Sequence, residues 1–296
     1  VGGGNWDWGW GVQDDRESIE AIHKALDLGI NWIDTAPAYG LGHSEEMVGK
    51  AIKGKRDQVI LATKCSLVWE GRTDGKVDHR LKAWSVRKEA EDSLRRLGVD
   101  VIDLYQVHWP NPDEEIEEGW GEIARLIQEG KIRYGGVSNF SVEQIERVQK
   151  IHPVASAQPE YSMLARSVEK GLLEYCEQHK IGVVAYSPMA SGLLTGKYNR
   201  ETVKEIHPED WRLKYNQHFK PENFGRNIER VEKLREIADR FGRSIGELAI
   251  AWVLRRKELT AAIVGSRRAS QIAQIAPASD WVLSVDVVEE IEEILR

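Results

Sequence analysis

Apolar residues in this chain follow two spacings that alternate along most of its length. Stretches with apolar residues three or four apart are typical of amphipathic helices, and short continuous apolar runs are typical of buried strands. A glycine often separates the two, as Gly29 separates the helical pattern of Ile19, Ile22 and Leu26 from the run that begins at Ile30. Because this order repeats, the sequence predicts strands that alternate with helices.

Seven strands are predicted from these runs. They are expected at 30–36, 59–64, 101–108, 134–139, 156–161, 182–188 and 261–266. Helices are expected between them and near the C-terminus, including 228–241, 244–256 and 284–296. Residues 70–82 and 197–227 lack clear periodicity and are predicted to be long loops, the second of them a lid or binding loop.

Polar residues before several helical patterns predict where these helices begin. Ser141 with Gln144, and Ser244 with Glu247, have the spacing of capping boxes. Ser44 is expected to cap a helix whose first turn carries acidic residues at the positive end of the helix dipole.

Strands that alternate with helices at this spacing imply βαβ units and a parallel sheet. A closed (β/α)8 TIM barrel needs eight strands, and the glycine-rich segment 1–11 is not a good strand. Either the sheet is open, or it is a barrel whose first strand is missing from the chain as given. We favour the α/β TIM barrel without its first strand, with residues 1–296 as a single domain.

Composition narrows the class of partner and compartment. The 296 residues carry a net charge of −7, which argues against nonspecific binding to nucleic acids or membrane surfaces. There is no signal peptide and no apolar run long enough for a membrane span. Cys65 and Cys176 do not make a disulfide framework, so we expect a cytoplasmic protein.

Ionisable or polar residues stand at the ends of four predicted strands. They are Asp34, Lys64, His108 and the pair Ser138–Asn139, with Tyr39 shortly after the first. In a barrel these ends converge on one face. There Asp34 is expected to keep Lys64 charged, and that ammonium is expected to lower the pKa of Tyr39 and make it a proton donor to a carbonyl oxygen. Each residue alone has an ordinary structural explanation, but the combination favours a catalytic site.

Several motifs resemble those of the aldo-keto reductases. Residues 34–40 are similar to the D-T-A-x-x-Y-G segment of that family, Lys64 to its T-K lysine, and His108 to the histidine of L-Y-Q-V-H. Residues 136–140 are similar to G-V-S-N-F, and 186–197 to Y-S-P-L-x-x-G-L-L-T-G-K. The similarity spans about 15–273 in family order. It implies a (β/α)8 barrel, NADPH as the hydride donor, and Asp34, Tyr39, Lys64 and His108 as catalytic residues.

The same resemblance implies a set of cofactor-binding residues. Ser138, Asn139 and Gln158 would bind the nicotinamide carboxamide, Tyr186 would stack on the ring, and 187–197 would hold the pyrophosphate. Near the adenosine end, the adjacent Arg267 and Arg268 suit a phosphate monoester and favour NADPH over NADH. The full set is Ser138, Asn139, Gln158, Tyr186, Ser187, Pro188, Met189, Ser191, Gly192, Leu193, Gly196, Lys197, Gly265, Ser266, Arg267, Gln271 and Gln274.

The glycine patterns do not fit other nucleotide-binding motifs. The spacing from Gly192 to Lys197 is one residue short of a P-loop, and Gly40–Gly42 lacks the third glycine of a dinucleotide fingerprint. No His or Cys spacing predicts a metal site.

Tryptophans on predicted loops are candidates for a substrate pocket. They are Trp6, Trp8, Trp10, Trp69 and Trp109, and they hint at an aromatic or apolar carbonyl. The sequence thus predicts an NADPH-dependent reductase of small aldehydes or ketones, whose substrate and oligomeric state it does not specify. The alternative is a regulatory or binding subunit that senses the cofactor on the same barrel.

Overall fold

Seven parallel strands form one curved sheet in the computed structural model, which describes Trp6, Gly9, Gly11 and residues 13–70, 72, 74–208 and 210–296. The order in the sheet is β1-β2-β5-β6-β7-β8-β9. All seven predicted strands are therefore present. The strands are β1 (Trp32–Asp34), β2 (Ile60–Cys65), β3 (Leu67–Val68), β4 (Asp78–His79), β5 (Ile102–Val107), β6 (Ile132–Ser138), β7 (Ser156–Gln158), β8 (Gly182–Ala185) and β9 (Leu259–Ala262).

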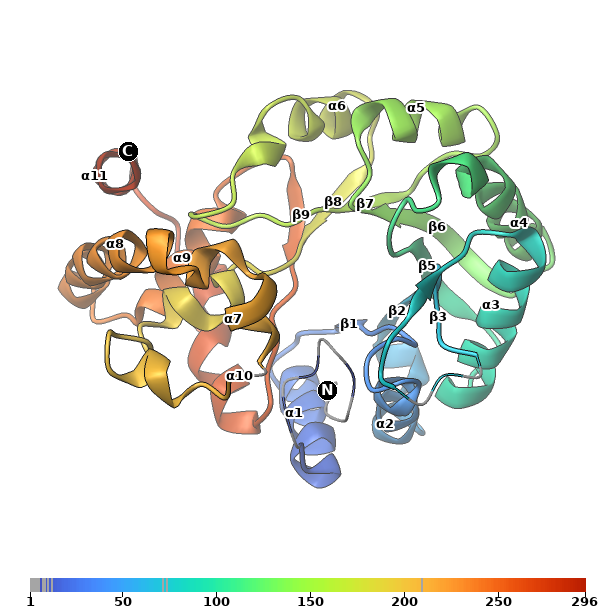
Figure 1. Cartoon of the computed structure of the whole chain (residues 1–296), viewed down its shortest axis with the longest axis horizontal. Helices are drawn as coiled ribbons and strands as arrows, with labels where there is room; N and C mark the ends of the chain where they lie inside the picture. Colours follow the sequence, from blue (N-terminus) through green and yellow to red (C-terminus); the bar gives the residue numbers. More distant parts are fainter. Residues whose placement is uncertain are drawn as a thin grey trace.

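Helices cover the outer face of this curled sheet, as expected for an α/β barrel (Figure 1). Figure 1 shows α2 to α6 outside the arc of strands, while α8, α9 and α11 form a separate group on one side. The helices are α1 (Asp15–Asp27), α2 (His43–Ile52), α3 (Ala83–Leu97), α4 (Ile116–Gln128), α5 (Val142–Gln149), α6 (Leu172–Gln178), α7 (Trp211–Tyr215), α8 (Pro221–Arg240), α9 (Ile245–Leu254), α10 (Ala269–Ile275) and α11 (Val285–Leu295). None of the described helices is both long and apolar enough to cross a bilayer.

Two apolar clusters hold these elements together. The first lies between the strands and helices α1 to α6, and its Trp120 and Tyr105 are fully buried. The second joins α8, α9 and α11 around Trp252 and Leu234. The two alternating spacings in the sequence arise from this packing, because the apolar stripes of the helices pack on strands that are buried on both faces.

Local capping signals predicted two helix starts correctly and one wrongly. Capping boxes begin α5 at Ser141 and α9 at Ser244. Ser44 does not cap α2, which begins one residue earlier after Gly42, a residue in the left-handed region with φ of 99°. The Ser44 hydroxyl instead hydrogen-bonds the hydroxyl of Thr35 at 2.8 Å. The interaction holds the turn after β1 against α2.

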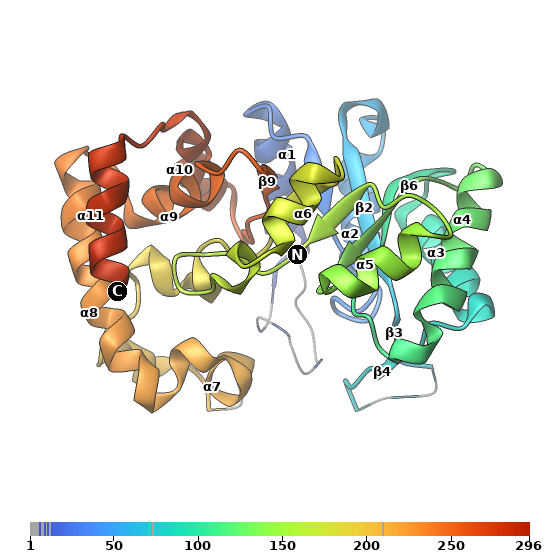
Figure 2. The ribbon, with the colours of Figure 1, turned by 90° about the horizontal axis from the view of Figure 1, so that it is seen from above.

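Both predicted long loops contain regular structure. Residues 70–82 include β4, which pairs antiparallel with β3. The segment 197–227 includes α7 and the first turns of α8, which begins at Pro221 and not near 228. Figure 2 shows α7 and the chain around it at the lower left, below α8.

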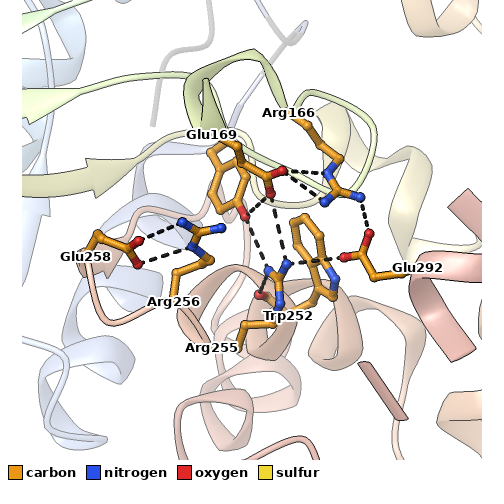
Figure 3. Close-up of polar contacts among 8 residues, drawn as sticks. Arg166, Glu169, Trp252, Arg255, Arg256, Glu258 and Glu292 are labelled. Carbon is orange, nitrogen blue, oxygen red and sulfur yellow. Dashed lines mark hydrogen bonds and ion pairs between the residues drawn. The ribbon is translucent and has the colours of Figure 1, made fainter. Parts of the chain in front are cut away.

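A network of charged and aromatic side chains fastens the C-terminal helix to the rest of the fold (Figure 3). Glu292 of α11 pairs with Arg166 and with Arg255 of α9. Arg166 also pairs with Glu169 at 2.9 Å, and Glu169 accepts a hydrogen bond from the Tyr161 hydroxyl at 2.7 Å. The backbone of Tyr161 bonds to that of Tyr186. The C-terminal helix therefore supports the segment that follows β7.

A buried acid on α3 should make stability depend on pH. Glu89 is 8% exposed, and burial raises the pKa of its carboxyl from 4.5 to about 8. Between these values the unfolded chain binds fewer protons than the folded one, so the free energy of unfolding falls as pH rises. We expect Glu89→Gln to remove this loss and to gain stability relative to wild type, by up to about 4 kcal/mol between pH 5 and pH 8.

Denaturant unfolding at several pH values would measure this difference. Glu91→Gln, at an exposed site on the same helix, is the matched control and should keep the wild-type slope. Parallel pH dependence of Glu89→Gln and wild type would contradict a protonated carboxyl at this position.

Candidate functional site

The carboxyl ends of the parallel strands meet at one mouth of the sheet. A cavity of about 1690 Å³ opens there. Asp34 ends β1, His108 follows β5, and Ser138 ends β6, and all three line this cavity with Tyr39. Lys64 is the penultimate residue of β2 and is fully buried next to them. The structure thus brings together the four side chains that the motifs singled out.

A buried ion pair forms the base of the site. Lys64 Nζ lies 2.5 Å from Asp34 Oδ1, and the two side chains are 0% and 6% exposed. The ammonium also donates to the backbone oxygen of Thr35 at 2.9 Å. Burial lowers the pKa of Lys64, but the charges and hydrogen bonds of Asp34 and Tyr39 together outweigh it, so the net shift is upward. Lys64 therefore stays protonated.

Two amides hold the other oxygen of Asp34. Gln158 Nε2 donates to Oδ2 at 2.8 Å and Gln106 Nε2 donates at 3.3 Å. Gln106 was not among the site residues predicted from the sequence. Its signal was a polar residue inside the apolar strand β5, two positions before His108 and therefore on the same face. These donors fix the carboxylate that faces Lys64.

Tyr39 lies over this pair in the turn before α2. The Lys64 ammonium is 5.2 Å from the centre of its ring, and the His108 ring meets it edge-on with 5.8 Å between centres. The expectation that Tyr39 has a lowered pKa is wrong. Burial raises the pKa of its hydroxyl by more than Lys64 lowers it, so the net shift is upward. Tyr39 therefore holds its proton.

His108 is neutral at this position. Burial is the main cause that lowers the pKa of its imidazole well below 6.5, with the charge of Lys64 and nearby His79 acting in the same direction. The backbone N–H of His108 donates to the Cys65 oxygen at 3.0 Å, which ties the ends of β5 and β2 together. A neutral imidazole can accept or donate one hydrogen bond here.

Beyond the ion pair, an ordered group of amide and hydroxyl side chains lines the cavity. Asn139 has left-handed backbone geometry, with φ of 63°, and donates to the backbone oxygen of His108 at 3.0 Å. Its Oδ1 accepts from the Tyr186 hydroxyl at 2.8 Å. Ser138 donates to the backbone oxygen of Gln158 at 2.8 Å. These bonds orient the three predicted carboxamide contacts and Tyr186 along one wall.

The segment after β8 makes a tightly turned edge to the cavity. Ser187, Ala190 and Ser191 all have left-handed backbone angles, with φ of 55°, 47° and 56°. The cavity wall includes Ser187, Pro188, Met189, Ser191, Gly192 and Lys197 from this segment. Of the other predicted contacts, Leu193 packs in the second apolar cluster and the oxygen of Gly196 accepts from Arg235, and neither lines the cavity. Asn216, which the sequence analysis missed, bonds the Ser191 hydroxyl at 3.0 Å.

The loop after β9 lines the far end of the cavity. Gly265, Ser266, Arg267, Gln271 and Gln274 are all in its wall. The adjacent arginines have separate surroundings. Arg267 Nε donates to Gln13 at 2.6 Å, whereas Arg268 pairs with Glu17 of α1 at 3.1 Å and is not part of the wall. Of these two arginines, only Arg267 lines the cavity.

Of the tryptophans predicted to line a substrate pocket, some line the cavity and others do not. Trp6 lines the cavity with its ring 5.8 Å from that of Tyr39, and Trp109 lines it with 42% of its surface exposed. Trp69 is not in the wall and lies against Arg96. Trp8 and Trp10 are outside the described residues. The β3–β4 hairpin, which the sequence analysis missed, adds Leu67, Val77 and His79 to the wall.

Comparisons with known proteins identify one family. The Aldo/keto reductase family model matches residues 1–296. The chain is 41% identical over 302 residues to the aldo-keto reductase YhdN of Bacillus subtilis, covering 100% of this chain and 89% of that one. It is 36% identical to the NADH-specific methylglyoxal reductase of Escherichia coli, covering 96% and 88%. The glycerol dehydrogenase structure from Gluconobacter oxydans superposes with a TM-score of 0.89 at 39% identity, covering 98% and 88%.

Neutralising Asp34 should destabilise the protein through Lys64. With Asp34→Asn the ammonium would remain buried without its anion, and we expect the free energy of unfolding to fall by about 3–5 kcal/mol at neutral pH. Denaturant unfolding would measure it. Adding Lys64→Met to Asp34→Asn removes the unpaired charge and should recover part of the loss. An Asp34→Asn variant as stable as wild type would contradict a charged Lys64.

Proposed function

Because this chain belongs to the aldo/keto reductase family, it is an oxidoreductase that uses a nicotinamide cofactor to reduce carbonyl compounds to alcohols, and we propose that NADPH is its hydride donor and Tyr39 its proton donor. The observation that carries this proposal is the position of the Tyr39 hydroxyl at the cavity, beside a fully buried ammonium that a carboxylate keeps charged.

The electrostatics of the site suit proton donation. A donor must hold its proton until the carbonyl oxygen gains charge, and burial keeps Tyr39 protonated. As the proton leaves, the phenolate that forms is stabilised by the Lys64 ammonium, which is already in place and needs no reorganisation. His108, held neutral, would hydrogen-bond the carbonyl oxygen and orient it toward Tyr39.

The residues along the cavity fit a nicotinamide dinucleotide. Most of the residues predicted to contact the cofactor, from Ser138 to Gln274, line one continuous cavity. Asn139, Ser138 and Gln158 would bind the carboxamide, and Tyr186 would pack against the ring. A side chain at Gly192 would place its Cβ 3.2 Å from Lys197 Cε, so glycine keeps this edge open. When bound, the reduced nicotinamide supplies a hydride to the carbonyl carbon.

Positive charge at the far end of the cavity supports NADPH over NADH. Arg267 and Ser266 stand in the wall there, and a guanidinium with a hydroxyl matches a phosphate monoester. Because Arg268 is engaged with Glu17, the preference would depend mainly on Arg267. One relative is named as specific for NADH, so the choice of cofactor needs its own test. The cytoplasmic location and the single domain stay predictions from the sequence.

Removing the Tyr39 hydroxyl should slow the reaction strongly while the protein still binds NADPH. Tyr39→Phe keeps the ring and removes the proton, so we expect kcat to fall about 10²–10⁴-fold with NADPH affinity nearly unchanged. Turnover is measured on a panel of simple aldehydes and affinity by quenching of tryptophan fluorescence. Wild-type rates in the variant would refute the proton-donor role. Wild-type protein that binds NADPH but reduces no carbonyl would favour the regulatory alternative.

A pair of neighbouring arginines tests the cofactor preference. Arg267→Ala should weaken NADPH binding about 10- to 100-fold, because a charged hydrogen bond to phosphate is lost, and should leave NADH binding nearly unchanged. The matched control is Arg268→Ala, whose guanidinium pairs with Glu17 outside the cavity wall. Equal losses for both cofactors, or the same effect from Arg268→Ala, would exclude Arg267 as the selective residue.

A further inference from the structure

The end of β2 is held in an uncommon backbone conformation next to the site. Ser66, two residues after Lys64, has φ of 88° and is fully buried. A residue with a side chain pays about 1–3 kcal/mol for such a conformation, and it persists only where its surroundings hold it. The hydrogen bonds of Ser66 identify the groups that hold it and the segments that depend on its position.

Ser66 connects three segments through its own polar atoms. Its backbone oxygen accepts from the N–H of Arg80 at 3.1 Å, just after β4. Its hydroxyl oxygen accepts from the N–H of Trp109 at 3.2 Å. Its own N–H donates to Glu89 Oε2 at 2.9 Å. Ser66 therefore links the β3–β4 hairpin and the turn after β5 to a side chain of α3.

Glu89 reaches Ser66 from α3, which lies on the outer side of the sheet. Its other oxygen accepts from the Ser85 hydroxyl at 3.0 Å, one turn earlier in α3. Within the described part of the chain it makes no ion pair, and its side chain is 8% exposed. The Ser66 N–H is as deeply buried, and leaving it without an acceptor would cost the desolvation of that group. Glu89 is thus the acceptor that makes the left-handed Ser66 tenable.

The segments that Ser66 connects form one end of the cavity. Leu67 follows Ser66 directly, His79 lies in the paired strand β4, and Trp109 is bonded to Ser66, and all three line the cavity. They stand on the His108 side, where the carbonyl would bind. The proposed cofactor contacts after β8 and β9 belong to other strands, so a shift of Ser66 would affect the two ends of the cavity unequally.

We propose that Glu89 is a positioning residue for substrate binding: through Ser66 it sets the wall formed by Leu67, His79 and Trp109. The inference rests on the proposed function, which locates the carbonyl beside Tyr39. Helix α3 would thus affect substrate affinity although none of its residues lines the cavity.

Two substitutions at Glu89 separate its role as a hydrogen-bond acceptor from its ability to ionise. Glu89→Leu removes the acceptor at similar volume and should raise KM for the carbonyl about tenfold or more, with kcat within a few-fold and NADPH affinity unchanged. Glu89→Gln keeps an oxygen for the Ser66 N–H and should restore KM to within about twofold of wild type. Hydrogen exchange of the peptides that contain 66–70 and 106–111 should be faster in Glu89→Leu only.

Matched variants complete the test. Glu122→Leu removes a buried carboxyl group of α4, which pairs with Arg87 of α3, and should lower stability without raising KM. If Glu89→Leu does not fold, Ser66→Ala removes only the acceptor for the Trp109 N–H and should raise KM in the same direction. The proposal is overturned if the folded variant has wild-type KM, if KM and NADPH affinity change together, or if Glu122→Leu reproduces the effect.

The exchange measurement also separates this proposal from the reaction itself. If the wild-type protein reduces no carbonyl, the proposed function fails, and faster exchange in Glu89→Leu would still show that Glu89 holds this wall. Unchanged exchange in a fully active protein would overturn the positioning role alone.

Discussion

A lysine ammonium with no exposure to solvent is the constraint from which the site follows. Taking such a charge out of water is costly, and it is sustained only by a close anion with satisfied hydrogen bonds. Asp34 is that anion, and Gln158 and Gln106 bind its second oxygen, so β1, β2, β5 and β7 all contribute to one charged centre. Each strand has to end at the correct height for these contacts, which couples the register of the sheet to the chemistry.

The Lys64 charge lowers the pKa of both neighbouring side chains, but their net shifts are opposite. Lys64 lowers the pKa of the Tyr39 hydroxyl, yet burial outweighs it and the phenol keeps its proton. At His108 burial and Lys64 act together, and the imidazole stays neutral. The site therefore holds one positive and one negative charge in a pair, with a phenol and an imidazole that are both uncharged. In the proposed reaction, the negative charge that develops as Tyr39 gives up its proton would lie beside the Lys64 ammonium.

The remainder of the fold supports the two ends of the cavity separately. The hairpin β3–β4 and the turn after β5 meet at Ser66, which α3 holds through Glu89. The segments after β7 and β8 are paired through the backbones of Tyr161 and Tyr186, and the charged network of α9 and α11 fastens them from outside (Figure 3). Helices α3 and α11, none of whose residues lines the cavity, thus contribute to its shape.

The sequence by itself determined the order of elements and the residues at the strand ends. Helical and strand spacing, glycine stops and the capping boxes at Ser141 and Ser244 are local signals, and so the seven strands could be predicted from them. The polar residues at Asp34, Lys64 and His108 stood out for the same reason, because an apolar strand has no local use for them. In a parallel sheet such ends must share one edge.

Only the tertiary structure decided what depends on partners distant in the chain. Ser44 could have capped a helix, but it is close enough to Thr35 to bond it instead. Arg268 looked equivalent to Arg267 until α1 brought Glu17 to it. The pKa of Tyr39 is a balance between burial and the field of Lys64, and no single segment contains both terms. Spacing along the chain records periodicity, whereas burial and long-range pairing arise only when the strands are assembled.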